Sequence, residues 1–232
     1  MGTLRYGGTH QMLDDKTKEE VKKKLKELKN PVTLIVFTQD GLVHLPGLEC
    51  EMCKDNRILM EEVASLSEQI NIEVYDFVKD KEKVEQYRID KIPATVIKGE
   101  SYKGIRIFGI PSGYEFAALL NAIDIVSSGE SGLSDDTKEK LKAISKPVHI
   151  QVFITLTCPY CSSAVAMAHR MALENDTITA DMVNAQEFPQ LAQKYNVFAV
   201  PKVVINEALQ FEGSLPEDMF LSNVEKSLGI LT

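Results

Sequence analysis

Four cysteines, arranged as two Cys-x-x-Cys pairs, are the residues of this chain best suited to chemistry. The pairs are Cys50-Glu51-Met52-Cys53 and Cys158-Pro159-Tyr160-Cys161, and the last cysteine of each lies 40 residues before a proline, Pro93 or Pro201. Disulfide exchange needs a thiolate that attacks, a second thiol that resolves the mixed disulfide, and a leaving group of low pKa. Two cysteines three positions apart can supply all three. The sequence therefore predicts thiol chemistry at two similar sites.

Within the second pair, Cys158 is the expected nucleophile and Cys161 the resolving thiol. If a helix begins at the pair, its exposed N–H groups and the positive end of its dipole favour negative charge on Cys158. Pro159 at the start of that helix allows the two cysteines to come within disulfide distance. Tyr160 lies inside the pair, where it can shape a substrate groove.

The two pairs are not expected to be equivalent. Glu49 and Glu51 flank Cys50, and negative charge close to a thiolate disfavours it. Cys158 has only neutral neighbours. We therefore expect Cys158 to have the lower thiol pKa and its pair to be the more oxidising, because a stabilised thiolate form raises the reduction potential of a dithiol. The second pair is then the main redox centre.

The elements that must position these cysteines occur in the same order in both halves of the chain. Each half begins with a charged helix that an aspartate can cap and a proline can end, followed by a β-rich strand, the cysteine pair and a second helix. A strand, a short helix, the later proline, two strands and a closing helix follow, which gives β-α-β-α-β-β-α after the extra leading helix. The predicted ranges are 14–29, 32–37, 56–69, 72–78, 81–87, 94–97, 105–108 and 114–126, then 135–146, 148–154, 162–173, 178–183, 187–195, 202–205, 209–212 and 218–228.

The boundary between the halves is expected in a cluster of small residues at 127–132. Such a composition is typical of a linker or a surface loop. We expect a disordered leader at 1–13, a first unit at 14–128 and a second unit at 129–232. The first half carries eight additional residues before its cysteine pair, around 40–47, which lengthen the approach to the first site.

The charge balance excludes some functions. A net charge of -8 and a pI near 5.1 argue against nucleic acid or an anionic membrane as a partner, because both attract clustered positive charge. The lysine-rich run at 16–29 also contains glutamates and apolar residues at helical spacing, which indicates a solvated amphipathic helix. No stretch has the composition of a secretory signal or a membrane span. We therefore expect a cytoplasmic protein.

The duplicated spacing, the Cys-Pro-Tyr-Cys tetrad and the dipeptides Ile92-Pro93 and Val200-Pro201 resemble those of a known family. This family is the two-unit protein disulfide oxidoreductases, also called glutaredoxin-like proteins, of thermophilic archaea and bacteria, and the resemblance covers about residues 14–230. It implies an α/β fold with two tandem thioredoxin-like units, each a central mixed sheet flanked by helices and each with an extra N-terminal helix. It also implies that both prolines are cis and lie against the cysteine pairs, where Ile92 and Val200 offer their backbone to a substrate peptide.

The activity that the resemblance implies is the reduction, oxidation or isomerisation of protein disulfides. No tightly bound cofactor or metal is implied, and the electrons would come from a thioredoxin reductase-like flavoprotein that draws on NADPH. Protein disulfides would be the substrates, with a peroxiredoxin as a further partner. The lysine- and glutamate-rich composition and the distribution of the family also indicate a thermophilic source.

Three other interpretations of the cysteines remain open. A dedicated peroxiredoxin reductant would resemble the N-terminal region of the flavoprotein reductases of alkyl hydroperoxidases, but those retain only one intact pair. A noncatalytic, zinc-stabilised scaffold commonly has its cysteine pairs about 15–20 residues apart, whereas 104 residues separate Cys53 and Cys158. A structural disulfide within Cys-x-x-Cys would constrain the unfolded chain little, because the loop that it closes is short.

The remaining polar residues give weaker signals. Thioredoxins carry a buried acid six residues before the first cysteine, but Val152 holds that position before Cys158. Glu73 and Asp181, on the next strands, are alternative candidates, and an exposed strand face is their expected position. The histidines are expected to have no catalytic role: His169 two turns into its helix, His149 in a strand, His44 in the additional loop and His10 in the leader.

Overall fold

The computed structural model describes residues 11–39 and 50–230, and it contains the predicted elements in the predicted order. Their bounds in chain order are α1 Asp15–Leu25, β1 Val32–Thr38, α2 Cys53–Ser65, β2 Ile70–Asp76, α3 Lys81–Gln86, β3 Ala94–Lys98, β4 Tyr102–Phe108, α4 Glu115–Ser128, α5 Asp135–Lys142, β5 Val148–Ile154, α6 Cys161–Glu174, β6 Ile178–Asn184, α7 Pro189–Lys194, β7 Lys202–Ile205, β8 Leu209–Glu212 and α8 Glu217–Ser227. No helix within these described ranges is both long enough and apolar enough to cross a membrane.

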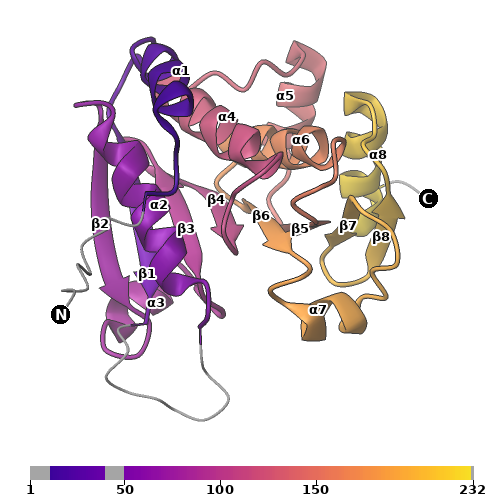
Figure 1. Cartoon of the computed structure of the whole chain (residues 1–232). Coiled ribbons are helices and arrows are strands. Elements are labelled where there is room, and N and C mark those ends of the chain that lie inside the picture. Colours follow the sequence, from indigo (N-terminus) through magenta and orange to yellow (C-terminus); the bar gives the residue numbers. More distant parts are fainter. Residues whose placement is uncertain (1–10, 40–49, 231–232) are drawn as a thin grey trace, which may run out of the picture.

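The strands form one continuous mixed sheet in the order β2-β1-β3-β4-β6-β5-β7-β8 (Figure 1). Within each half two strands pair in parallel and two more are added antiparallel, which gives β2-β1-β3-β4 and β6-β5-β7-β8. The halves meet where β4 pairs in parallel with β6, from Ile105 opposite Ala180 to Phe108 opposite Val183. The predicted α/β class and the duplication are confirmed, and the two sheets are joined into one.

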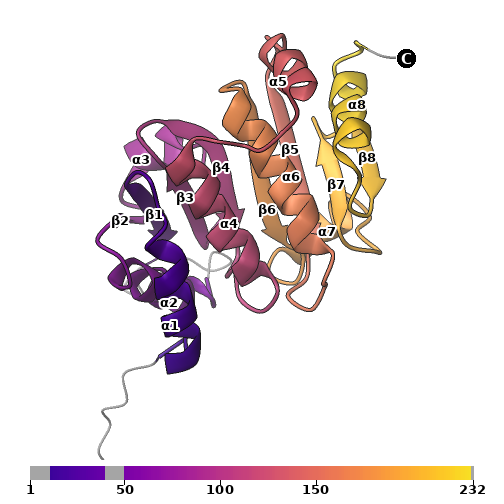
Figure 2. The same ribbon diagram turned by 90° about the horizontal axis from the view of Figure 1, so that it is seen from above.

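Helices cover both faces of this sheet, over two separate apolar clusters. Because successive strand residues point to opposite faces, Leu34 and Val36 belong to the cluster that includes apolar residues of α1, α2, α4, α5, α6 and α8. Ile35 and Phe37 belong to the other cluster, near α3 and α7. Helices α4 and α6 pack side by side over the central strands (Figure 2). This packing brings the first turns of α4 and α6 together, one from each half of the chain.

A buried ionic cluster crosses the junction between the halves. Arg106 of β4 donates from Nε and Nη2 to the two carboxylate oxygens of Asp181 on β6, at 2.7 and 2.9 Å, and His149 Nε2 lies 2.6 Å from Asp181 Oδ2. Burial by itself would raise the pKa of Asp181, but the charge of Arg106 and the hydrogen bond with His149 outweigh it, so the pKa is lowered. The expected exposed position of Asp181 is therefore wrong. The reason is that β6 lies inside the continuous sheet and not at an edge.

The segment 127–132, expected as a linker or surface loop, is partly exposed and partly packed: Gly129, Glu130 and Gly132 are exposed, whereas Ser127 and Ser131 are buried. Ser127 is still within α4, is buried, and exchanges hydrogen bonds with the backbone of Asn30. Ser131 is also buried and donates to Glu174. Gly129, at φ 70°, ends α4 by donating its N–H to the carbonyl of Ile125, a conformation that glycine adopts without steric cost. The two buried serines mark close contacts, and the exposed residues between them form the expected surface loop.

Two further expectations at the helix starts need correction. Residues 11–13 were placed in the leader, but the N–H groups of Met12 and Leu13 both donate to the Glu62 carboxylate at 2.9 Å, and Leu13 is buried. The aspartate cap is confirmed for α1, where Asp14 accepts from the N–H of Thr17. In α5, by contrast, the capping residue is Ser134, because its extended backbone precedes the first helical residue. Residues 1–10 and the additional residues around 40–47 lie outside the described part of the chain.

Candidate functional site

Both cysteine pairs lie between the end of a strand and the start of a helix, and both form disulfides. Cys53 and Cys161 are the first residues of α2 and α6, and the Cα–Cα distances within the pairs are 5.4 and 5.6 Å. Cys53 and Cys161 are 2% and 0% exposed, whereas Cys158 is 8% exposed and Cys50 is half-buried. The first cysteine of each pair is therefore the more accessible one, which suits the expected role of Cys158 as nucleophile.

The helices that begin at the two pairs have no side-chain cap. Met52 and Tyr160 occupy the capping positions of α2 and α6, and neither side chain accepts a hydrogen bond from the helix. The N–H groups of a first helical turn have no partner inside the helix, and they carry the positive end of the helix dipole. They can therefore stabilise a thiolate on the preceding cysteine once the disulfide is reduced.

A cis proline stands beside each pair. The peptide bonds Ile92-Pro93 and Val200-Pro201 are both cis, as the family resemblance implies, and each proline comes directly before a strand. At the second site, Sγ of Cys158 lies 3.7 Å from the carbonyl oxygen of Val200. At the first site, Cys50, Ile92 and Pro93 line one groove. The structure thus brings each predicted proline dipeptide to its cysteine pair.

The groove of the first site has a volume of about 450 Å³ and is built by both halves of the chain. The first half contributes Cys50, Glu51, Met52, Ile92, Pro93 and Ile110. The second half contributes the opposite wall, made of Leu156, Asn184, Gln186, Glu187, Pro189 and Gln190. Leu156 lies two residues before Cys158, so the groove of the first site extends to the segment that carries the second.

The residues that pack behind the two pairs differ in polarity. Three residues after Cys53, the buried Asn56 donates from Nδ2 to Oγ1 of the buried Thr95, at 3.2 Å. The matching positions of the second site are Ala164 and Val203, both fully buried. The interior is therefore polar behind the first pair and apolar behind the second.

Glu115, in the first turn of α4, is a buried carboxyl group that sequence reasoning missed. It is 0% exposed, and neither carboxylate oxygen has a hydrogen-bond partner among the described residues. The preceding residue, Tyr114, donates its N–H to the carbonyl of Leu156 at 3.3 Å, which places the start of α4 against the segment leading into Cys158. Burial raises the pKa of Glu115 to about 7. A carboxyl group in the first turn of the helix that starts against this segment can therefore exchange its proton near neutral pH.

One signal in the sequence could have identified Glu115. It lies four and seven residues before Leu119 and Ala122, and residues at that spacing share one face of a helix. Both of those residues are fully buried, so a charged residue on the apolar face of α4 was visible in the pattern. The sequence did not indicate that Glu115 belongs near the second site, because 43 positions separate it from Cys158 and the segments are brought together by the packing of α4 on α6.

The other candidates lie in different surroundings. Val152 is fully buried in β5, at the position where a thioredoxin carries its acid. Glu73 is half-buried on β2, where it accepts a hydrogen bond from the hydroxyl of Tyr75 at 2.8 Å. His169 is buried in α6, and burial lowers its pKa to about 4, so it is neutral at pH 7. His44 and His10 lie outside the described residues.

The four cysteine sulfurs are joined in two separate disulfides. A zinc site made of all four would need both pairs at one point. The described residues contain no group of three or more His, Cys, Asp or Glu placed to hold a metal ion.

Two solved structures are similar to this chain over more than nine-tenths of its length. The crystal structure of a protein disulfide oxidoreductase from Aeropyrum pernix k1 matches with 34% identity, a TM-score of 0.86, and coverage of 97% of this chain and 99% of that one. The NTD_N/C domain of the alkylhydroperoxide reductase AhpF of Enterococcus faecalis matches with 26% identity, a TM-score of 0.82, and coverage of 91% and 99%. A family model described as a thioredoxin domain matches residues 148–226.

Curated sequences extend the comparison. The F component of an alkyl hydroperoxide reductase from Pseudomonas putida is 21% identical over 218 residues, and an NADH dehydrogenase of Bacillus subtilis is 26% identical over 171 residues. These alignments cover 94% and 74% of this chain but only 38% and 31% of the relatives. The chain thus spans about a third of the length of the curated relatives that it matches.

Proposed function

This chain belongs to the protein disulfide oxidoreductases, and we propose that it moves electrons to and from other proteins at both Cys-x-x-Cys sites, with Cys158-Pro159-Tyr160-Cys161 as the main one. The observation that carries this proposal is the position of Cys158. It is the more accessible cysteine of its pair, it precedes a helix with no side-chain cap, and it lies against Val200 beside a cis proline. The first pair has the same surroundings of helix and proline.

In the reducing direction, the Cys158 thiolate attacks one sulfur of a substrate disulfide. A mixed disulfide forms between Cys158 and the substrate, and the other substrate sulfur leaves as a thiolate that takes up a proton. The Cys161 thiolate then attacks Sγ of Cys158, re-forms the protein disulfide and releases the second substrate thiol. Two electrons pass from the protein to the substrate, and the same steps in reverse oxidise a substrate dithiol. The cysteines carry the electrons themselves, so no bound cofactor is required.

We assign Glu115 the role of proton acceptor and donor for the second pair. Cys161 is fully buried and must lose its proton before it can attack. A general acid or base works best with a pKa near the working pH, and burial brings the pKa of Glu115 to about 7. Glu115 belongs to the first half of the chain, so the second site would use a residue of its neighbour.

The substrate would lie along the proline segments. The extended backbone at Ile92 and Val200 would pair with the substrate peptide, while Pro159 and Tyr160 would shape the groove of the second site. Units at 14–128 and 129–232 match the repeated order of elements, and residues 11–13 join the first unit.

The electron donor of this proposal is a thioredoxin reductase-like flavoprotein that uses NADPH, and the electron acceptors are protein disulfides. The relatives named as an NADH dehydrogenase and as an alkyl hydroperoxide reductase component support a nicotinamide-linked donor. We place this electron transfer in the cytoplasm. The charged lysine- and glutamate-rich helices support a heat-stable protein from a thermophile.

A second candidate function is favoured by one observation. The match to the NTD_N/C domain of AhpF covers nearly the whole chain, so a peroxiredoxin is a candidate electron acceptor. A coupled assay that measures peroxide consumption with purified peroxiredoxin and this protein would test it. Four cysteines in two intact pairs favour the broader activity, and a rate with peroxiredoxin far above the rate with other protein disulfides would favour the dedicated role.

Insulin reduction by paired variants tests the main proposal. Cys158→Ser should lose most of the turnover with dithiothreitol as reductant, and Cys50→Ser should retain most of it. The same variants should show the same ranking when the oxidised protein oxidises a reduced substrate. Full turnover in a variant that lacks both Cys50 and Cys158 would contradict thiol exchange at these sites.

A further inference from the structure

The segments before the two cis prolines have the same backbone. Arg88 and Asn196, each five residues before its proline, have φ angles of 52° and 51°. In both segments the next residue donates its N–H to the carbonyl five positions earlier, at 2.9 and 2.8 Å. Asp90 and Phe198, each three residues before the proline, therefore occupy equivalent positions. Any difference between the sites at this point arises from the side chains.

Both segments also offer an unpaired backbone donor. Within the described part of the chain, the N–H groups of Ile92 and Val200 donate no hydrogen bond. An extended peptide can add to such a segment through main-chain hydrogen bonds whatever its sequence, while side-chain contacts give the specificity. Each segment can therefore accept an extended polypeptide, and the side chains around the site would determine which one binds.

The surroundings of the second site carry exposed aromatic side chains. Phe198 is 90% exposed, Tyr160 71% and Tyr114 56%, and these are three of the five large hydrophobic side chains exposed among the described residues. Tyr160 lies two residues after Cys158, and Phe198 lies two residues before Val200, whose carbonyl faces Cys158. Two residues span at most about 7 Å of chain. We call Tyr160 and Phe198 the aromatic rim.

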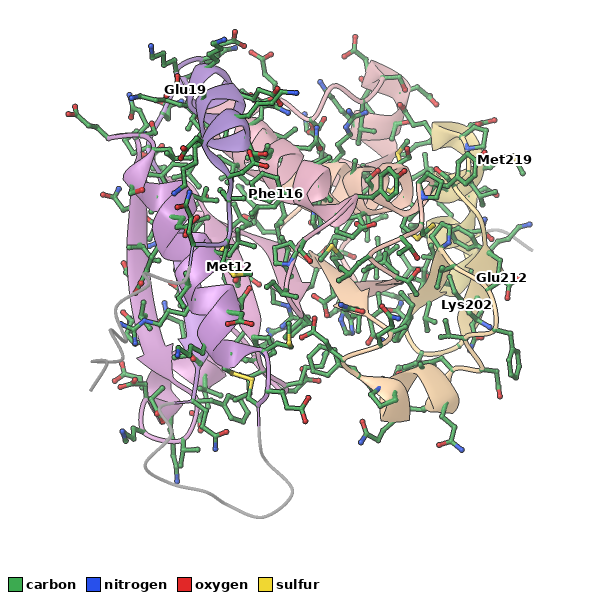
Figure 3. All side chains as sticks on the ribbon, in the orientation of Figure 1. Met12, Glu19, Phe116, Lys202, Glu212 and Met219 are labelled. Carbon is green, nitrogen blue, oxygen red and sulfur yellow. A yellow bond between two sulfur atoms is a disulfide. The ribbon has the colours of Figure 1, made fainter. Side chains whose placement is uncertain are left out.

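The segment that carries Phe198 is held in place from both ends. Nζ of Lys202 donates to the carbonyl of Asn196 at 3.0 Å and lies 3.9 Å from Glu212 on the neighbouring strand, and Figure 3 shows these two side chains close together. On the other side, Gly213 donates its N–H to the carbonyl of Pro201 at 2.8 Å. Phe198 is thus presented to solvent from a fixed backbone. Rigid, exposed aromatic side chains are typical of contact surfaces.

The surroundings of the first site are polar and acidic. Asp90 replaces Phe198; its side chain is 69% exposed and is paired with Nζ of Lys91 at 2.7 Å. Glu51 replaces Pro159 and is also exposed, so Glu51 carries the acidic charge and Asp90 adds polarity. The opposite wall of the groove carries the exposed Gln186 and Gln190, together with Glu187. This charge suits a segment with basic or polar side chains.

Resting on the proposed disulfide exchange, we propose that the two sites divide substrates by polarity. The second site takes disulfides in extended segments with bulky apolar neighbours, which contact the aromatic rim. The first site takes disulfides flanked by basic or polar residues. In each reaction the protein dithiol gives two electrons and two protons to the peptide disulfide, so one disulfide forms in the protein as one breaks in the peptide.

Single-turnover kinetics with two peptides test this division. Each peptide carries an internal disulfide, flanked by leucine and phenylalanine in one and by lysine and serine in the other. The protein is used pre-reduced, in two backgrounds: Cys50→Ser/Cys53→Ser leaves only the second site, and Cys158→Ser/Cys161→Ser leaves only the first. Phe198→Asp is then added to the former and Asp90→Phe to the latter, which exchanges the two matched residues. Ile230→Asp is the control, because Ile230 is 56% exposed and lies beyond the far end of α8.

In the Cys50→Ser/Cys53→Ser background, Phe198→Asp should lower the rate constant for the apolar peptide about fivefold to tenfold, because an aromatic contact of moderate strength is lost. The rate constant for the basic peptide should change less than about twofold. Asp90→Phe should raise the apolar rate at the first site, and Ile230→Asp should change neither rate. Equal effects of Phe198→Asp on both peptides would overturn the division. Glutathione disulfide distinguishes failure of the substrate division from failure of the proposed function. If glutathione disulfide is reduced normally while the peptides show no preference, only the division fails. If no disulfide is reduced, the proposed function fails as well.

Discussion

Replacing Glu115 with glutamine should stabilise the protein at pH 8 and leave its stability almost unchanged at pH 4.5. The carboxyl group is fully buried without a hydrogen-bond partner among the described residues, and burial raises its pKa from 4.5 to about 7. Between pH 4.5 and about pH 7, the two pKa values of this group, the unfolded chain has released the proton and the folded chain still holds it. The free energy of unfolding therefore falls as the pH rises through this window, and it levels off above about 7.

The size of this effect follows from the pKa. At about 1.4 kcal/mol per pH unit, a rise from 4.5 to about 7 corresponds to about 3 kcal/mol. Glutamine has nearly the same volume and carries no titratable proton, so Glu115→Gln should be more stable than the parent by up to about 3 kcal/mol at pH 8. The same variant should reduce insulin more slowly near neutral pH and lose the dependence of the rate on a group of pKa about 7, because the proposed proton acceptor for Cys161 is gone.

Urea unfolding of the oxidised protein at pH 4.5, 6 and 8 measures this difference. Glu19→Gln, on the exposed surface of α1, is the matched control and should be neutral at all three values. A difference between Glu115→Gln and the parent that is the same at pH 4.5 and pH 8 would refute the assignment of a raised pKa. Unchanged turnover with an unchanged pH profile would refute the role in proton transfer.

Three further outcomes are expected. Gly104→Ala should lower the free energy of unfolding by about 1–3 kcal/mol, since φ is +70° and an added Cβ would collide with backbone of β6; an unchanged urea midpoint would contradict this. Asp181→Asn should lower the free energy of unfolding by about 3–5 kcal/mol, because it leaves the buried Arg106 without its charged partner. A decrease below about 1 kcal/mol in urea unfolding would show that the ionic cluster contributes little to stability. Alkylation by iodoacetamide as a function of pH, in single-site variants, should give a lower apparent thiol pKa for Cys158 than for Cys50, and the opposite order would remove the basis for ranking the sites.

The sequence predicted the fold well because its signals are local and occur twice. Alternating apolar residues, prolines before strands and the two cysteine pairs fix the order of elements, and each half confirms the other. The start of α5 at Ser134 and the membership of Leu13 were missed because capping geometry and a contact with Glu62 are not periodic features. The small residues at 127–132 predict a surface loop, which Gly129, Glu130 and Gly132 form, but they do not reveal that Ser127 and Ser131 are buried.

The features of the site that escaped the sequence all depend on contacts between the halves. Asp181 could not be placed inside the sheet without knowing that β4 pairs with β6. The start of α4, which carries Glu115, lies against Leu156 and α6 of the second half, and the groove of the first site includes Asn184 and Glu187 of that half. The repeated sequence pattern predicts the fold of each unit. It does not predict how the two units join, because that depends on contacts between residues far apart in the chain.

Trapping of the mixed disulfide tests most directly which cysteine reacts with substrate. Cys161→Ser and Cys53→Ser each remove one resolving thiol, so a substrate attacked by the remaining partner stays covalently bound. Incubation with a disulfide-containing protein, followed by non-reducing electrophoresis and peptide mapping, should show a covalent complex at Cys158 in Cys161→Ser, with a smaller amount at Cys50 in Cys53→Ser, and dithiothreitol should release both. Absence of any complex, or a greater yield at Cys50 than at Cys158, would contradict the second pair as the main redox centre.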